Sequence, residues 1–300
     1  MRQVTPPITY ISVIIPNYCH SMFLEQRISS VLNQTYQNYE LIIMDDCSPD
    51  NGLSKAVIER YRNNKHVSQI IYNEKNSGCT FLQWKKGIEM AKGDWIWIAE
   101  SDDYCEPNFL EMLVKNIKEG DVLAYSGTHF VNESGELLDE PENLRSKIFR
   151  FIFQDNRLVK RWKSNEFIEE NLTFGTTVCN ASMAIFKKSA ALTIPQDYLS
   201  YKAVGDRLFW IHISEKGNVV CYNKPLNCFR QHANKVSPRS LVDGTTAFED
   251  ARINDYILQT RHISAVRWFI MMCSFYRRYM RTILSSIVKL RCCSTAIIAS

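Results

Sequence analysis

An apolar run in the first half of the chain ends abruptly in three carboxylates within four positions. Residues Trp95–Ile98 have the composition of a buried strand, and Glu100, Asp102 and Asp103 follow closely. Buried strands in open α/β sheets present their functional groups at the carboxyl end, where ligands bind. Crowded carboxylates repel one another unless a cation or a proton lies between them. The pattern therefore favours a divalent-metal site over a solvated acidic turn.

Two earlier apolar runs end in the same way. Residues 11–15 lead into the sequence Pro-Asn-Tyr, and residues 40–44 lead into Asp-Asp. Helical periodicity between the runs gives a strand–helix–strand–helix–strand order, which is typical of a parallel sheet. The three polar ends then fall on one edge of that sheet.

The other expected elements have ordinary lengths. Helices are expected over residues 22–32, 53–63, 83–91 and 109–117, and strands are expected over residues 67–72 and 122–125. Residues 132–175 are the least regular part, which suits either a partner-facing loop or a plain surface excursion. Residues 178–229 return to apolar runs and complete the sheet. We expect an α/β fold with a mostly parallel, Rossmann-like sheet flanked by helices.

Composition and cysteine spacing exclude several classes of protein. The 300 residues are 45% hydrophobic and 23% charged, which is enough for one large domain or a domain with an appendage. The ten cysteines include no Cys-x-x-Cys pair, so a zinc knuckle is not expected. Reduced thiols in a cytosolic enzyme are the simplest account of them. The first ten residues hold no long apolar segment, so we expect no signal peptide.

The net charge of +4 is concentrated at one end of the chain. No acidic residue follows Asp255, whereas seven basic residues do: Arg261, Arg267, Arg277, Arg278, Arg281, Lys289 and Arg291. Removing these seven from the 36 basic residues leaves 29 against 32 acidic ones, a net charge of −3 for residues 1–255. A nucleic-acid-binding body is therefore not supported.

The basic tail also carries a helical pattern. Apolar positions recur every three or four residues, at Phe269, Met272, Tyr276, Met280, Ile283, Ile287 and Leu290. Arginines interrupt every window, so no run of about 18 uncharged apolar residues could span a bilayer. Residues 263–290 predict a basic amphipathic helix lying in an anionic membrane interface, with a helix packed on the body as the alternative. We place the domain boundary between residues 245 and 246.

Glycine-rich phosphate loops are missing from the chain. It contains neither Gly-x-Gly-x-x-Gly nor Gly-x-x-x-x-Gly-Lys-Ser/Thr. Any bound phosphate would then be held by a cation rather than by a loop of backbone amides. Aspartates together with one imidazole suit Mg²⁺ or Mn²⁺.

Five short motifs occur in a characteristic order. They are Val13–Tyr18, Glu40–Asp46, Asn76–Gly78, Gly87–Gly93 and Ser101–Asp103. Together they resemble the family 2 glycosyltransferases of the GT-A fold, of the type that builds bacterial surface glycans. The resemblance covers roughly residues 10–237. It implies inverting transfer of a sugar from a nucleotide sugar, with Mn²⁺ or Mg²⁺, to a glycan or lipid-linked acceptor at the cytoplasmic face of a membrane.

The resemblance also implies roles for residues at the three strand ends. The nucleoside pocket would be lined by Pro16, Asn17 and Tyr18. Asp46 would accept a hydrogen bond from uracil or thymine, which implies a UDP- or dTDP-sugar. Asp102 would lie near the ribose and the metal, and Asp103 would be the principal metal ligand.

Two downstream motifs complete the implied site. Asp206 would be the general base that takes the proton of the acceptor hydroxyl. It would equally serve as the N-cap of a helix starting at Arg207. His232 would be a third metal ligand or a phosphate contact, and Arg230 would help to hold negative charge.

The chain departs from the family pattern in two places. Many relatives have an arginine shortly after the Asn-x-Gly turn, where this chain reads Phe-Leu-Gln-Trp-Lys-Lys, and we assign the donor contact to Lys85. The Gln-x-x-Arg-Trp signature of processive synthases is missing, which favours addition of a single sugar. A nucleotidyltransferase and a catalytically silent carbohydrate-binding scaffold remain the alternatives.

Overall fold

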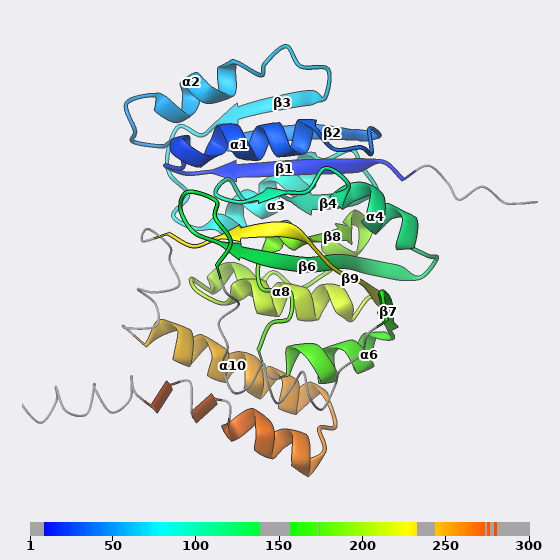
Figure 1. The fold of residues 1–300 in the computed structure, drawn as a ribbon. Coiled ribbons are helices and arrows are strands. Elements are labelled where there is room, and N and C mark those ends of the chain that lie inside the picture. Colours follow the sequence, from blue (N-terminus) through cyan, green and yellow to red (C-terminus); the bar gives the residue numbers. More distant parts are fainter. Residues whose placement is uncertain are drawn as a thin grey trace, which may run out of the picture.

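A single sheet with helices on both faces forms the body of the protein (Figure 1). The computed structural model describes residues 9–138, 157–173, 175–232, 244–273, 275, 276, 279 and 280. The strands are β1 (Ile11–Asn17), β2 (Tyr39–Asp45), β3 (Val67–Tyr72), β4 (Trp95–Ile98), β5 (Tyr104–Cys105), β6 (Asp121–Val131), β7 (Val159–Trp162), β8 (Ala184–Lys187) and β9 (Asn218–Arg230). The helices are α1 (Ser21–Leu32), α2 (Leu53–Glu59), α3 (Thr80–Met90), α4 (Phe109–Asn116), α6 (Ser164–Phe167), α7 (Lys188–Ala191), α8 (Gly205–Ser214) and α10 (Thr245–Thr260).

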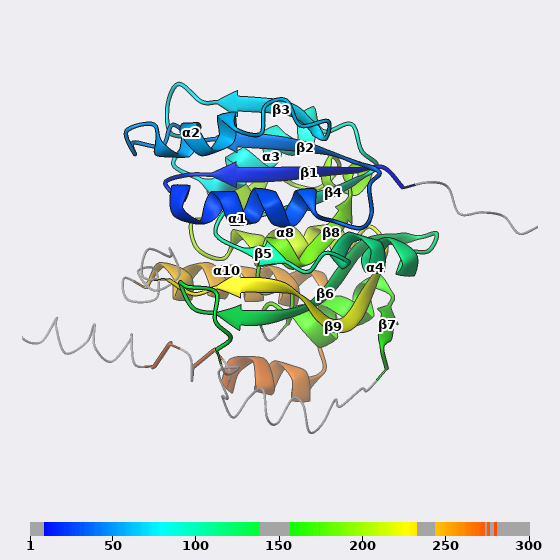
Figure 2. The same cartoon turned by 45° about the horizontal axis from the view of Figure 1, so that its top comes forward.

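The described strands form one sheet in the order β3-β2-β1-β4-β8-β6-β9-β5, with β7 paired to β9. Strands β1 to β4 are parallel, as the sequence predicts. Strand β8 runs antiparallel to both β4 and β6, so the second half of the sheet is mixed. Figure 2 shows β5 and β9 beside β6 at the end of the sheet remote from β3.

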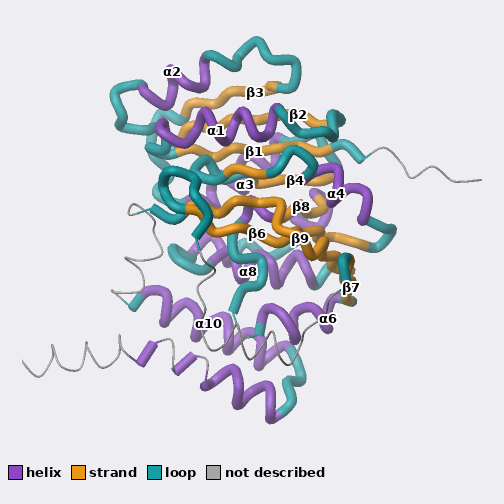
Figure 3. The backbone as a smooth tube through the Cα atoms, viewed as in Figure 1, coloured by secondary structure: helices purple, strands orange, loops and turns teal. Residues whose placement is uncertain are grey.

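Each face of the sheet has its own apolar core. On one face, α1, α2 and α4 cover residues such as Val13, Leu41 and Trp97. On the other, α3, α8 and α10 cover Ile14 and Ile96 among others. Strands buried on both faces read as continuous apolar runs, which is why the runs before each polar end are so uniform. Figure 3 shows the helices on both sides of the strands.

Two glycines let α3 and the start of β4 approach the first strand closely. A Cβ at Gly93 would lie 2.5 Å from Ser12 N, and one at Gly87 would lie 2.7 Å from Ile14 Cγ2. Gly93 N donates to Ser12 Oγ (2.8 Å), and that hydroxyl donates to Glu40 Oε1 (2.6 Å). The Gly87–Gly93 motif therefore fixes β4, and the acidic turn after it, against β1.

Most expected elements are confirmed, with shifted ends. The helix expected over 53–63 ends at Glu59, the one expected from residue 83 begins at Thr80, and the strand at 122–125 extends to Val131. The irregular stretch 132–175 contains β7, α6 and a π-helical turn (Ile168–Leu172) among its described residues. Because β7 adds a strand beside β9, this stretch is partly a piece of the body.

Helix α10 is also part of the body, although the boundary expected from the sequence would exclude it. Ile253 and Ile257 are fully buried in the same core as α8. Glu249 accepts hydrogen bonds from three successive backbone N–H groups, those of residues 202–204, at 2.7 to 3.0 Å. Any separable extension therefore starts after α10 rather than at residue 246.

A further helical segment, residues 265–273, follows α10 and lies beside it (Figure 1). Met271 and Tyr279 face inward, and the Tyr279 hydroxyl donates to Asp250 of α10. The outward side is apolar: Val266 is 70% exposed and Phe269 is 63% exposed. None of the helices among the described residues combines the length and apolar character needed to cross a bilayer. The predicted positions Ile283, Ile287 and Leu290 lie outside the described residues.

Candidate functional site

The parallel register brings the polar ends of β1 and β2 side by side, as predicted. Asn17 lies opposite Asp45, and Asn17 Nδ2 donates to Asp45 Oδ1 (2.7 Å). Asp46 N donates to the backbone oxygen of Asn17 (2.9 Å). Pro16 is buried within β1, whereas Tyr18 is 45% exposed just beyond its end. Tyr18 is thus the member of the Pro-Asn-Tyr motif that is most open to a ligand.

Asp46 organises the loop that follows β3. Its carboxylate accepts hydrogen bonds from Asn73 Nδ2 (2.6 Å), Ser77 Oγ (2.6 Å), Ser77 N (3.0 Å) and Gln83 Nε2 (2.9 Å). Ser77 belongs to the Asn-Ser-Gly turn of the family-like pattern. Asp46 therefore links the end of β2 to that turn and to α3, beside any contact it makes with a base.

The acidic turn after β4 meets two histidines. His20, Asp102 and His232 each offer one ligand atom, and the three atoms lie within 4.8 Å of one another. His232 Nε2 donates to Asp102 Oδ2 (2.9 Å). His20 Nδ1 is hydrogen-bonded to Ser101 Oγ (2.9 Å). One carboxylate and two imidazoles thus converge from the segments that follow β4 and β9 and from the residue just before α1.

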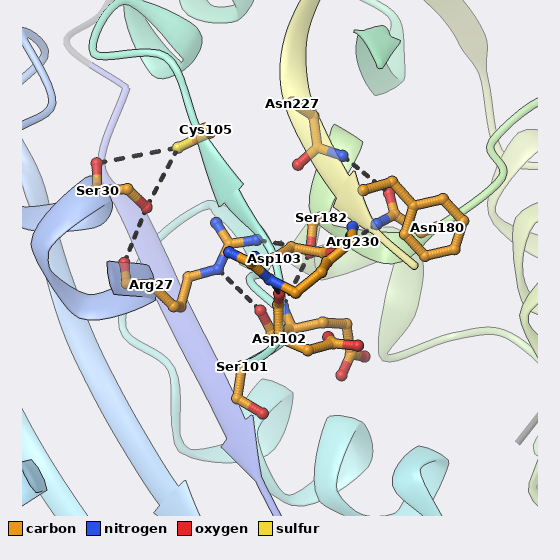
Figure 4. A network of polar contacts seen from close by, with 12 residues as sticks. Arg27, Ser30, Ser101, Asp102, Asp103, Cys105, Asn180, Ser182, Asn227 and Arg230 are labelled. Carbon is orange, nitrogen blue, oxygen red and sulfur yellow. Dashed lines mark hydrogen bonds and ion pairs between the residues drawn. The ribbon is translucent and has the colours of Figure 1, made fainter. Parts of the chain in front are cut away.

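The neighbouring Asp103 belongs to a buried network of polar contacts with Asn180 and Arg230 (Figure 4). Its Oδ1 accepts from Arg230 N (3.0 Å), its Oδ2 accepts from Asn180 Nδ2, and Arg27 lies 3.9 Å away. The sequence predicted Asp103 as the principal metal ligand. Only 1% of Asp103 is exposed, and both of its carboxylate oxygens accept hydrogen bonds, so its described contacts connect the turn that carries Asp102 to Arg230 and Asn180. The ligand role of Asp103 stays a prediction.

Arg230 is likewise buried, and it supports the backbone of the site. Its Nε donates to the Asp102 backbone oxygen (2.8 Å), and its Nη1 donates to the Glu133 backbone oxygen (2.6 Å). The guanidinium also lies over the rings of Phe23 and Tyr104. The sequence assigned Arg230 to bound negative charge. Its described side-chain contacts are with this backbone, with Gln26 Oε1, to which its Nη2 donates, and with these rings.

Glu100 contributes the third carboxylate of the turn. Burial raises the pKa of the Glu100 carboxyl to about 8, and the nearby Asp102 charge adds to the shift. Trp84 Nε1 donates to Glu100 Oε1 (2.9 Å), and the Trp84 ring packs edge-on against Phe209 of α8 at 5.5 Å. Trp84 therefore connects the acidic turn to the helix that carries Asp206.

Asp206 lies in the first turn of α8, which begins at Gly205 rather than at Arg207. Its carboxylate accepts a hydrogen bond from Arg207 N (2.8 Å). Burial raises the pKa of Asp206 to about 7, and this effect outweighs the lowering by that backbone contact. A carboxyl group with a pKa near the working pH is suited to accept a proton during a reaction.

The neighbouring Arg207 is buried and secures α8. Its Nη1 donates to Asp250 Oδ1 (2.8 Å), its Nη2 donates to Asn254 Oδ1 (2.9 Å), and its Nε donates to the Leu172 backbone oxygen (3.0 Å). Asp250 and Asn254 belong to α10. The position of Asp206 thus depends on a helix that the sequence pattern had assigned to a separate extension.

Lys85 is the predicted site residue least integrated with the others. It lies on α3, partly exposed, and its described ion pair is with Glu89 one turn along the same helix, at 3.8 Å. The sequence interpretation also missed His20, Asn180 and Arg27. His20 stands two positions after the Pro-Asn-Tyr motif, but only the fold shows that this position faces Asp102.

Comparison with known proteins identifies the family. Residues 12–193, more than half of the chain, match the model of glycosyl transferase family 2. The chain is 29% identical over 209 residues to poly(ribitol-phosphate) beta-N-acetylglucosaminyltransferase TarP of Staphylococcus aureus, which is 65% of this chain and 63% of that protein. It is 32% identical over 120 residues to glycosyltransferase GlyG of Streptococcus pneumoniae, and the matched part is 40% of this chain and 39% of that protein. The chain thus spans less than two thirds of these relatives.

Solved structures agree on the fold. S. aureus TarS (residues 1–349) in complex with UDP-GlcNAc superposes with a TM-score of 0.64 at 17% identity, covering 91% of this chain and 73% of that one. The mannosyltransferase PcManGT from Pyrobaculum calidifontis, in complex with GDP-Man and Mn²⁺, gives a TM-score of 0.60 at 13% identity, covering 99% and 84%. The chain therefore belongs to glycosyl transferase family 2 and has the GT-A fold.

Proposed function

We propose that this protein is an inverting glycosyltransferase of surface-polysaccharide synthesis. It would move a single sugar from a nucleotide-diphosphate sugar to a hydroxyl group of a glycan or lipid-linked acceptor. The observation that carries the proposal is a group of side chains that could hold a metal ion, together with a carboxyl group whose pKa is raised to about 7, on elements connected through Trp84. Inverting transfer needs a held diphosphate leaving group and a base for the attacking hydroxyl.

Asp102 and His232 would hold Mn²⁺ or Mg²⁺. The donor set fits, because a carboxylate oxygen and an imidazole nitrogen 2.9 Å apart are both suitable ligands for such ions. When bound, the ion supplies positive charge that offsets the charge developing on the diphosphate. Asp103 and Arg230 would position Asp102 by fixing its backbone.

Asp206 would remove the proton from the acceptor hydroxyl. Because its pKa is raised to about 7, the carboxylate form predominates only above that pH. A base of this strength takes up a proton more readily than an ordinary exposed aspartate does, and it still releases that proton near neutral pH. Glu249 and Arg207 would keep the base in place through α10 and α8.

The donor would be a UDP-sugar or a dTDP-sugar. TarP is named as an N-acetylglucosaminyltransferase, and the similar TarS structure is a complex with UDP-GlcNAc. The similar PcManGT structure is a complex with GDP-Man, so the same fold also accepts a guanine nucleotide. The nucleoside would lie near Tyr18 at the end of β1, with Asn17 and Asp46 supporting that edge of the sheet. Lys85 would reach the donor only after leaving Glu89.

The enzyme would bind peripherally to the inner face of the cell membrane, where a lipid-linked acceptor is accessible. The outward apolar side of the segment after α10, with Val266, Phe269, Ile270 and Tyr276, supports this proposal. So does the run of seven basic residues without an acid after Asp255. Apolar side chains and cations together are what an anionic interface attracts.

Flotation with liposomes tests this membrane proposal. A Val266→Ser/Phe269→Ser protein should bind anionic vesicles at least about tenfold more weakly, because each large apolar side chain contributes roughly 1.5–3 kcal/mol when buried. Leu192→Ser, at an exposed leucine on another part of the surface, is the matched control and should bind normally. Equal recovery of the wild-type protein with anionic and neutral vesicles would contradict the proposal.

A panel of nucleotide sugars with Mn²⁺ tests the reaction itself. Release of UDP or dTDP in the presence of a glycan acceptor supports the proposed transferase. Release of pyrophosphate from a nucleoside triphosphate and a sugar phosphate would instead indicate a nucleotidyltransferase. Binding of sugars without any released nucleotide would indicate a silent scaffold.

A further inference from the structure

We propose that His20 is a third protein ligand of the metal site, and that the resulting two-histidine, one-carboxylate set selects first-row transition ions over Mg²⁺. The inference rests on the proposed function only in taking Asp102 and His232 as the other two ligands. It adds a residue that no sequence motif assigned, and it makes a statement about which ion the site prefers.

The distances fit a single ion. Ligand atoms on opposite sides of an ion with bonds of about 2.1 Å lie about 4.2 Å apart, and those on adjacent sides lie closer. The ligand atoms of His20, Asp102 and His232 all lie within 4.8 Å of one another, so a small inward shift of the side chains brings all three to one centre.

The surroundings of His20 resemble those of a metal-binding imidazole. Its Nδ1 is hydrogen-bonded to Ser101 Oγ (2.9 Å), and Ser101 directly precedes Asp102. Metal-binding histidines usually have their ring orientation fixed by such a partner. His20 directly precedes α1, so its backbone is held by that helix. The His20 ring lies edge-on to the His232 ring, with centroids 5.4 Å apart. The two imidazoles are therefore held as a pair.

The composition of the set determines the preferred ion. Mg²⁺ favours oxygen ligands and keeps several of its waters, so a second imidazole contributes little to its binding. First-row transition ions gain from imidazole nitrogen, increasingly from Mn²⁺ through Fe²⁺ to Co²⁺. Adding His20 to a site made of Asp102 and His232 should therefore separate the affinities for Co²⁺ and Mg²⁺.

A purely structural role for His20 is the competing explanation. Its ring also lies near Phe23, with centroids 6.1 Å apart, so it would then act as an aromatic spacer between α1 and His232. His20→Phe separates the two roles, because phenylalanine keeps an aromatic ring and has no ligand atom. His66→Phe is the matched control, since His66 is stacked on Tyr39 away from the cluster.

The first experiment titrates the full-length protein with Co²⁺, followed by visible absorbance, and repeats the titration in competition with Mg²⁺. Wild-type protein and His66→Phe should bind Co²⁺ more tightly than Mg²⁺. His20→Phe should bind Co²⁺ at least about tenfold more weakly, because loss even of a partner that only orients a ligand costs this much. Co²⁺ affinity of His20→Phe within twofold of the wild-type value would overturn the inference.

The second experiment needs no variant. Pulsed electron paramagnetic resonance of the Mn²⁺-loaded wild-type protein counts the ligating nitrogens: couplings from two imidazoles support the inference, and coupling from one overturns it. Nucleotide release from the donor panel separately tests the proposed function. Two nitrogen couplings without sugar transfer would contradict the proposed function alone. One coupling with normal transfer would contradict the role of His20 alone.

Discussion

The two halves of the proposed site, Asp102-Asp103 after β4 and Asp206-Arg207 in α8, are built in the same way. In each pair one residue is buried in a polar network, and the other is the one to which the proposed function gives a chemical role. Asp103 is held by Arg230 from within the sheet, whereas Arg207 is held by α10 from beyond it. The difference teaches that the proposed metal half is supported by the sheet itself, while the half carrying the proposed base depends on α10.

The other two members of the pairs, Asp102 and Asp206, also have different surroundings. Asp102 is hydrogen-bonded to the imidazole of His232 (2.9 Å). Asp206 is desolvated, and its pKa is raised to about 7. In the proposed function the first half would hold a cation, and the second would accept a proton.

Removing Asp102 should have the largest effect on activity. Asp102→Ala should lower Mn²⁺-dependent sugar transfer by roughly 10³-fold or more, because the bound ion contributes several kcal/mol and each 1.36 kcal/mol is tenfold in rate. Nucleoside diphosphate release at saturating Mn²⁺ measures this loss. Asp94→Ala, at the exposed residue just before β4, is the control and should be fully active. Normal transfer by Asp102→Ala would contradict the proposed metal-binding role of Asp102.

The second largest effect on activity is expected when Asp206 can no longer accept a proton. Asp206→Asn should bind donor normally and turn over about 10²–10⁴-fold more slowly, because an amide cannot accept the proton. In the wild-type enzyme the raised pKa means that the base becomes deprotonated as pH rises through about 7, so the rate should increase there. The variant should lose that increase. A pH–rate profile measures both effects, and an unchanged profile would assign the proton transfer to another group.

Loss of the Arg207 anchor should act on stability. Arg207→Met should lower the free energy of unfolding by about 3–5 kcal/mol, because it leaves Asp250 buried without its ion-pair partner. Urea unfolding measures the change. Arg252→Met, an exposed arginine on the same α10, should change stability far less. If the two variants are equally stable, α10 does not support α8 in the way the contacts indicate.

The smallest of these effects is expected at Asp103. Asp103→Ala should cost about 1–3 kcal/mol of stability, because it leaves the buried donors of Arg230 and Asn180 without their acceptor. It should retain Mn²⁺ binding within a few-fold, since Asp102 and His232 remain. Calorimetric titration with Mn²⁺ decides the matter. A folded Asp103→Ala protein that no longer binds Mn²⁺ would restore the ligand role that the sequence predicted.

Sequence reasoning succeeded where local pattern determines structure. Uniform apolar runs predicted the parallel strands β1, β2 and β4, and parallel strands necessarily bring their polar ends to one edge. The sequence pattern could not show which of the two adjacent aspartates, Asp102 or Asp103, would be the more deeply buried. Asp103 faces inward because Asn180 and Arg230, far along the chain, approach it from that side. Such long-range partners leave no trace in the spacing of the motif itself.

The position of α10 was missed for a similar reason. Its segment lies at the start of a tail whose net charge is basic, and that trend suggested an appendage. Glu249, Asp250 and Asn254 form its buried polar side, and their partners are the backbone at 202–204 and Arg207. In sequence alone, a polar helix face that is hydrogen-bonded to another helix has the same pattern as a face that is exposed to water.

The dependence of α8 on α10 also determines which part of this protein can be exchanged as one piece. The match to the family model ends at residue 193, before either helix begins. A chimaera that exchanges α8 for that of a relative, to change acceptor preference, would separate Arg207 from the α10 residues that fit it. The two helices would have to be transplanted together. For the same reason, a natural substitution at Arg207 would require compensation at Asp250 or Asn254, so these positions should vary together across descendants of this sequence.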